Sequence, residues 1–107
     1  MDDARERKLA QNEALARAVN EEVEKLVSVW ADESTAIELI CECSLATCSE
    51  RIHVPRTDYH RTRESPVRFL VCDEHVVEEI EDRIGTAGDA TVVEKRGEGR
   101  DVAIQEA

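Results

Sequence analysis

The first third of the chain has the hydrophobic pattern of one long helix. Residues 4–31 contain neither glycine nor proline and are dominated by alanine, glutamate, leucine, arginine and lysine, which favour about seven helical turns. Seven positions recur at alternating spacings of three and four: Leu9, Asn12, Ala16, Val19, Val23, Leu26 and Trp30. This is the seam of a coiled coil. The face either binds a helix of a partner or second copy, or lies across its own small domain.

Short segments typical of strands follow. SERIHVP places Ile52 and Val54 on one face and Arg51 and His53 on the other, as a strand requires. It can return beside AIELIC, so we predict a β-hairpin with a cysteine-rich loop at its tip. VRFLVC is a nearly continuous apolar run, and ATVVEKR is expected at the sheet edge. The predicted strands are 36–41, 49–55, 67–72 and 90–96.

Two short helices and a tail complete the predicted elements. YHRTRE (59–64) precedes Pro66, which would end a helix there. EHVVEEIEDRI (74–84) has apolar residues at helical spacing, Asp73 as a cap and Gly85 as a stop. The last segment, 97–107, has two glycines and no clear period. We expect it to be a flexible tail.

Composition makes a metal or cross-link useful to this chain. Only three of its 107 residues are aromatic, and a domain of this size buries only about two thirds of its unfolded surface. The net charge of −11 disfavours binding to nucleic acids and anionic membranes. No apolar run is long enough for a membrane span or signal peptide. We therefore expect a cytoplasmic protein, in which clustered thiols are reduced and serve as metal ligands or catalytic groups.

The segment CECSLATC offers three such thiols, Cys41, Cys43 and Cys48. Zn²⁺ prefers four ligands in a tetrahedron, so one must come from elsewhere. Cys72 and His75, which lie at the end of the third predicted strand and just beyond it, are the two candidates. His53 and His60 are weaker, because His53 faces away from the apolar side of its strand and His60 lies on an arginine-rich helix.

A resemblance to a protein family bears on the choice between Cys72 and His75. The segments CECSLATCSERIHV, RESPVRFLVCDEH and ATVVEKR, with Tyr59 after the first, resemble a family of small actinobacterial proteins with a zinc-knuckle-like CxCx4C…H pattern. QNEALARAVNEEVE also matches, so the resemblance covers nearly the whole chain. It implies Cys41, Cys43, Cys48 and His75 as ligands and favours His75 over Cys72, where the family more often has a small apolar residue. The SLAT loop departs from such knuckles, which often use Gly or Asp in the turn.

The resulting prediction is an α+β fold pinned by a zinc site. A long N-terminal α-helix, in residues 1–33, is followed by a small antiparallel β-sheet with two short helices. The sheet, the short helices and the metal form a zinc-binding domain of residues 34–96. Residues 97–107 form the tail.

An arginine-rich window, residues 50–68, separates two acidic flanks. It holds five arginines, two histidines and three acids. Its arginines could contact phosphates while Tyr59 stacks on a base, although the window could equally be a solvated face. The five are Arg51, Arg56, Arg61, Arg63 and Arg68.

These patterns favour a binding role over catalysis. Four protein ligands would close a zinc site to water, and no HExxH motif, phosphate loop or serine nucleophile elbow is present. We expect no enzyme and no small-molecule substrate, but a zinc-stabilised protein-interaction module that binds a basic component of the transcription or translation machinery. The alternatives are a thiol/zinc redox switch and nucleic-acid binding through residues 51–68.

Overall fold

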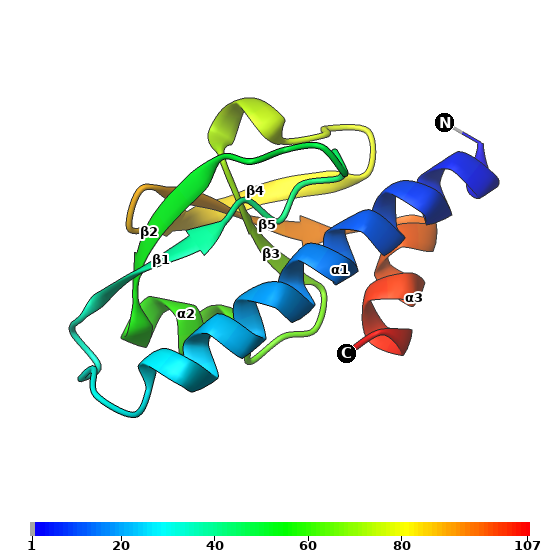
Figure 1. The fold of residues 1–107 in the computed structure, drawn as a ribbon. Coiled ribbons are helices and arrows are strands. Elements are labelled where there is room, and N and C mark those ends of the chain that lie inside the picture. Colours follow the sequence, from blue (N-terminus) through cyan, green and yellow to red (C-terminus); the bar gives the residue numbers. More distant parts are fainter. Residues whose placement is uncertain (1) are drawn as a thin grey trace.

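A computed structural model describes residues 2–107 as an α+β fold, with the long helix lying along two small antiparallel sheets (Figure 1). The helices are α1 (Asp3–Val27), α2 (Arg56–Thr62) and α3 (Gly97–Gln105), with a 3₁₀ turn, η1 (Asp73–His75). The strands are β1 (Ala36–Ile40), β2 (Arg51–Pro55), β3 (Arg68–Val71), β4 (Glu81–Ala87) and β5 (Ala90–Lys95). None of the helices within residues 2–107 is both long and apolar enough to cross a membrane.

The predicted long helix is confirmed as α1, which is shorter than expected at its C-terminal end. The Asp2 side chain caps it by accepting a 2.9 Å hydrogen bond from the backbone N–H of Arg5. One face of the helix is buried against the rest of the chain. The buried residues of that face are Ala10, Glu13, Ala14, Arg17 and Asn20.

The predicted heptad seam lies beside this buried face. Several seam residues directly precede a buried one, as Asn12 precedes Glu13, so the seam is rotated from the buried face by about 100°. Val23 packs against the core, whereas Leu26 is 73% exposed and Trp30, beyond the helix end, is 75% exposed. The helix therefore lies across its own domain while part of the seam faces solvent.

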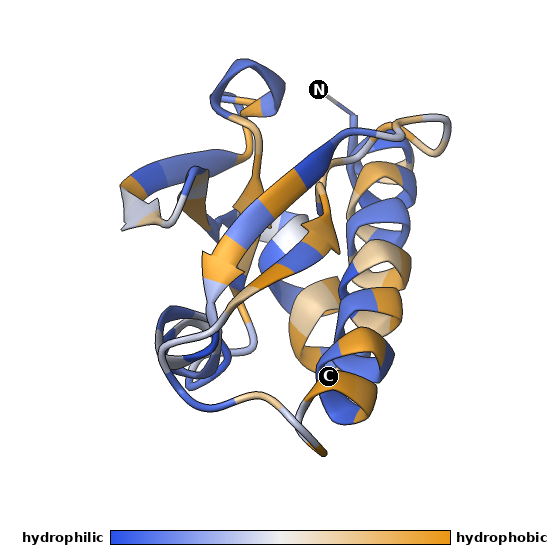
Figure 2. Ribbon diagram, turned by 60° about the vertical axis from the view of Figure 1, so that its left-hand side comes forward, coloured by the Kyte–Doolittle hydropathy of each residue, from blue (hydrophilic) through white to orange (hydrophobic). Residues whose placement is uncertain are grey.

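The predicted hairpin is confirmed as β1 and β2, which pair antiparallel with Ile37 opposite Val54 and Leu39 opposite Ile52. These four side chains are buried and form the core under the hairpin. In Figure 2, hydrophobic and hydrophilic residues alternate along these strands, the pattern of a sheet with one buried face. The remaining strands form a second sheet, in the order β3-β5-β4, rather than extending the first.

Two predictions about the segments that form the second sheet were wrong. The segment expected as a helix, 74–84, contains only the single turn η1 before β4 begins at Glu81. Because β4 pairs with β5, the segment expected at the sheet edge is the central strand. The Gly88–Asp89 turn that joins them requires glycine, since Gly88 has φ +58° and a Cβ there would lie 2.0 Å from the His53 carbonyl oxygen.

The expected flexible tail, 97–107, instead contains α3, which packs against α1 (Figure 1). Val102 and Ala103 are buried. A Cβ at Gly99 would lie 2.9 Å from the Lys95 side chain and 3.7 Å from the Ala10 side chain. The absence of a side chain at Gly99 leaves room for the Lys95 side chain. The prediction of a flexible tail, which rested on the glycines of this segment, was therefore wrong.

A buried charge cluster connects α1 to the second sheet. The Lys95 ammonium donates to Glu13 at 2.6 Å and to Glu81 at 2.8 Å, and all three side chains are at most 1% exposed. One ammonium can balance only one of the two carboxylates. Burial accordingly raises the pKa of Glu13 to about 8 from its ordinary value near 4.5, against the Lys95 charge, which lowers it.

This cluster predicts a pH dependence of stability. A carboxyl whose pKa is higher in the folded chain stabilises the fold fully below the unfolded pKa, and this contribution is lost as the pH rises through the folded value. The free energy of unfolding of the wild type, minus that of Glu13→Gln, should therefore fall between about pH 5 and pH 8. Urea unfolding of both proteins across this range measures the difference, in which effects of other groups cancel. A flat difference would contradict the elevated pKa.

Candidate metal centre

Three of the predicted ligands lie in the loop that joins β1 to β2. Cys41 directly follows β1, and its backbone N–H donates to the Glu50 carbonyl at 3.0 Å, which extends the hairpin pairing. The SLAT segment turns without glycine: the N–H of Cys48 donates to the Leu45 carbonyl at 3.0 Å, and no non-glycine residue from 2 to 107 has positive φ. This turn brings Cys48 back toward Cys41 and Cys43.

The fourth residue comes from the other sheet. His75 is the last residue of η1, directly after β3, and its Nδ1 lies 3.4 Å from the Cys41 sulfur and 3.6 Å from the Cys48 sulfur. The ligand atoms of Cys41, Cys43, Cys48 and His75 all lie within 4.8 Å of one another. Zinc bonds of about 2.3 Å to sulfur and about 2.0–2.1 Å to nitrogen would separate the two atoms by about 3.5 Å in a tetrahedron. The group therefore fits a tetrahedral ion.

The pKa values of the thiols are also consistent with a bound cation. Cys41 and Cys43 are each 3% exposed and belong to a core cluster with Phe69 and Val93. A hydrogen bond with Cys41 lowers the pKa of Cys43 to about 5, and this bond and burial raise the pKa of Cys41. These opposite shifts have one cause, because two neighbouring thiols share one negative charge more readily than they carry two. A bound divalent ion would supply the positive charge that favours ionisation of all three thiols.

Cys72, the alternative fourth ligand, lies outside the group of four. Its backbone N–H donates to the Cys41 sulfur at 3.2 Å, while its side chain packs against both core clusters. A backbone donor of this kind stabilises a coordinating thiolate from the outer shell. The structure thus places His75 among the thiols and Cys72 behind one of them.

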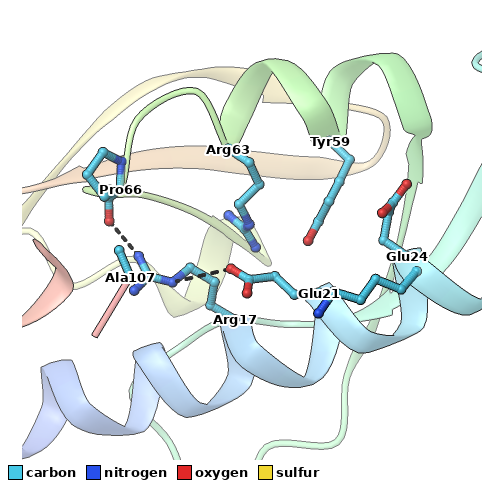
Figure 3. Close-up of a pocket in the computed structure, with 8 residues that line it drawn as sticks. Arg17, Glu21, Glu24, Tyr59, Arg63, Pro66 and Ala107 are labelled. Carbon is cyan, nitrogen blue, oxygen red and sulfur yellow. Dashed lines mark hydrogen bonds and ion pairs between the residues drawn. The ribbon is translucent and has the colours of Figure 1, made fainter. Parts of the chain in front are cut away.

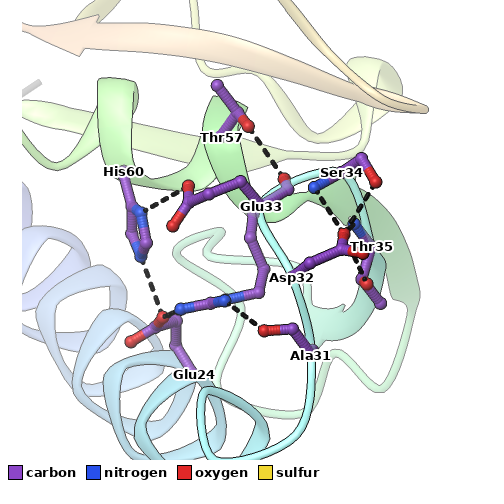
Figure 4. A network of polar contacts seen from close by, with 9 residues as sticks. Glu24, Ala31, Asp32, Glu33, Ser34, Thr35, Thr57 and His60 are labelled. Carbon is purple, nitrogen blue, oxygen red and sulfur yellow. Dashed lines mark hydrogen bonds and ion pairs between the residues drawn. The ribbon is translucent and has the colours of Figure 1, made fainter.

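The other two histidines are engaged elsewhere. His53 Nδ1 lies 3.1 Å from the Asp89 carboxylate. His60 lies between two carboxylates, with Nε2 2.8 Å from Glu24 and Nδ1 3.2 Å from Glu33, in the network that joins α2 to the end of α1 (Figure 4). Both histidines therefore form contacts between secondary-structure elements.

Most of the arginines considered as phosphate contacts form ion pairs within the chain. Arg56 is buried and pairs with Glu24 at 2.9 Å, while Arg51 is exposed on β2. The remaining pairs are Arg61 with Asp58, Arg63 with Glu42 and Arg68 with Glu94. Four of the five predicted phosphate contacts thus already have a carboxylate partner, and they do not form an open basic surface.

The sequence suggested Glu42, which lies between the first two cysteines, only as a possible general base and gave no indication of its structural role. Its side chain is fully buried and accepts hydrogen bonds from the Leu70 N–H and the Asn20 amide, both at 2.8 Å, and from Arg63. Its own N–H donates to the Leu70 carbonyl at 2.8 Å. Glu42 therefore fixes the thiol-bearing segment against β3 and α1. The only sequence signal was a charged residue within a cysteine pair at the end of an apolar strand.

Comparisons of the chain with protein-family models, curated proteins and solved structures give no match. The resemblance to actinobacterial zinc-knuckle-like proteins therefore rests on the sequence motifs alone. The assignment of the site rests on its geometry.

The two possible fourth ligands can be separated by mutation. Cys72→Ala keeps the backbone N–H that bonds Cys41 and should retain metal with little change in affinity. His75→Ala removes a ligand and should weaken binding by at least the 10- to 100-fold that loss of an outer-shell partner typically costs. Competition with a chromogenic chelator measures both affinities. Loss of metal from Cys72→Ala alone would reverse the assignment.

Proposed function

We propose that this protein is a non-catalytic protein-interaction module stabilised by one Zn²⁺. The observation that carries the proposal is the convergence of three thiols and one imidazole within 4.8 Å. Thiolate and imidazole ligands in a tetrahedron are the preferred set for zinc. Four protein ligands complete that coordination, whereas catalytic zinc keeps a position for water or substrate.

The location of the site supports a structural role for the metal. It would join the hairpin loop, which supplies the thiols, to η1, which follows β3 in the second sheet. Cys41 and His75 are 34 residues apart in sequence, so their connection through zinc would close a long loop. Because such a site rarely exists in the unfolded chain, the free energy of zinc binding would contribute directly to folding. It would supplement a core that contains few aromatic residues.

The outer face of α1 is the surface that we assign to the partner. Leu15 is 69% exposed, Val19 43% and Leu26 73%, and their spacings of four and seven place them on one side of the helix. Trp30 and Val29 extend the exposed apolar residues beyond the helix end. The hydrophobic positions along α1 can be followed in Figure 2.

Charge selects the kind of partner. The chain carries a net charge of −11, and residues 1–33 contain nine acids against five bases. An acidic surface around an apolar stripe complements a basic partner with an apolar patch. Basic surfaces with apolar patches occur on proteins that also bind nucleic acid. We therefore propose that the partner is a component of the transcription or translation machinery.

Metal removal tests the structural role of zinc. Native mass spectrometry should find one zinc per chain, and chelation should lower the thermal midpoint by more than about 10 °C, the effect of about 2 kcal/mol in a domain of this size. Circular dichroism follows the unfolding, with zinc added back as the control. An unchanged midpoint after complete metal removal would contradict a structural zinc.

Mutation of the exposed stripe tests the interaction surface. Leu15→Asp combined with Leu26→Asp should abolish binding to purified bacterial ribosomes or RNA polymerase in biolayer interferometry, while zinc content and thermal midpoint stay unchanged. Ile104→Asp is the matched control, because Ile104 is a half-exposed apolar residue on α3. Absence of binding by the wild type would contradict the partner class. Binding that survives the double substitution would contradict the surface.

A further inference from the structure

A pocket of about 350 Å³ lies between α1 and α2, away from the cysteine loop (Figure 3). Pockets of this size are large enough for small organic ligands. Arg17 and Glu21 reach it from α1, and Tyr59 reaches it from α2, with Arg63 directly beyond that helix (Figure 3). None of these residues is a candidate metal ligand, and Arg63 alone is connected to the cysteine segment, through Glu42.

Two buried hydrogen-bonding groups without a partner meet at this pocket. Within residues 2–107, the buried side-chain atoms that lack a hydrogen bond are Tyr59 Oη and Arg63 Nε. Tyr59 is only 3% exposed, and Figure 3 shows its hydroxyl and the Arg63 guanidinium pointing from the α2 side into the space above α1. Buried polar groups are normally hydrogen-bonded, so two unpaired groups at one pocket indicate that an acceptor belongs there.

A buried cation lies at the same pocket. Arg17 is 2% exposed, and its Nη1 and Nη2 donate to the carbonyl oxygens of Pro66 and Ala103, which carry no net charge. Its Nε lies 4.0 Å from Glu21, beyond hydrogen-bond length. Burial and the neighbouring Arg63 charge lower the pKa of Arg17. An anion in the pocket would oppose this lowering by favouring the charged guanidinium, as Glu21 already does in part.

We propose that this pocket binds a small organic monocarboxylate, with the carboxylate accepting from Tyr59 and the arginines and its apolar body against the ring of Tyr59 and Pro66. A phosphate dianion fits less well, because Glu21 and Glu24 also line the pocket and would repel the second charge. Arg63 is already paired with Glu42, so the carboxylate would draw mainly on the Tyr59 hydroxyl and on Arg17, which Glu21 neutralises only from 4.0 Å. This inference does not depend on the metal or on the interaction surface.

Titration of the zinc-loaded protein with matched small molecules tests the ligand class. Benzoate and butyrate should cause saturable amide shifts at residues 59 and 63 in ¹⁵N-edited NMR spectra, whereas benzamide and butyramide should cause none. Inorganic phosphate should bind more weakly than benzoate. Equal shifts with the amides, tighter binding of phosphate, or no saturable shift with either carboxylate would overturn the proposal.

Tyr59→Phe separates ligand binding from stability. Removal of a buried hydroxyl that has no partner should leave the thermal midpoint unchanged or higher, while loss of a hydrogen bond to a carboxylate should weaken benzoate binding at least about fivefold. A lower midpoint with unchanged benzoate affinity would mean that the hydroxyl serves only the fold, and would overturn the proposal.

Glu21→Gln provides a test in the opposite direction. Glu21 is half-exposed at the pocket and supplies the carboxylate nearest to Arg17, so its neutralisation should strengthen benzoate binding about two- to fivefold at low salt. Glu38→Gln is the control, because Glu38 is an exposed carboxylate on β1 that does not line the pocket. The same effect from both substitutions would contradict local recognition in the pocket.

Discussion

We propose that the fold depends on one group, the three thiols and one imidazole that lie within 4.8 Å of one another. Three thiols this close, two of them buried, ionise together only at a high free-energy cost unless a cation lies among them. The surrounding structure is arranged to hold them there. A tight loop returns Cys48 toward Cys41, β3 delivers His75 through a single 3₁₀ turn, and the Cys72 N–H donates to the Cys41 sulfur. Zinc would convert this costly arrangement into a link between the two sheets.

Buried polar groups perform much of the packing that aromatic residues perform in other small domains. Asn20 donates to the Ile40 carbonyl at 2.9 Å and to Glu42 at 2.8 Å, which fixes α1 to the segment that carries the cysteines. Lys95 joins α1 to the second sheet through Glu13 and Glu81. Such contacts require particular partners, so they specify one position of the helix, which apolar packing alone defines less sharply. These polar contacts lie on the inner side of α1, so the apolar residues on its outer face remain exposed.

The sequence predicted the elements whose signals are local. The long helix, the hairpin and the clustering of three cysteines all follow from residue type and spacing. His75 was one of two candidates because it follows the third predicted strand, but the choice between it and Cys72 depends on how β3 lies beside the hairpin, which no spacing supplies. The segment 74–84 has an apolar period that fits a helix, yet pairing with β5 makes its last part the strand β4. Glycines at 97 and 99 indicated flexibility, although Gly99 lies within α3 and leaves room for the buried Lys95 side chain. Tertiary contacts decided each of these cases.

X-ray absorption at the zinc edge of the purified protein tests the central claim most directly, because it counts the atoms bound to the metal. The account predicts three sulfur ligands at about 2.3 Å and one nitrogen at about 2.0–2.1 Å. Four sulfur ligands would mean that Cys72 binds in place of His75. A light-atom ligand in the wild-type protein that exchanges with added anions would mean an open site, and would contradict a structural zinc.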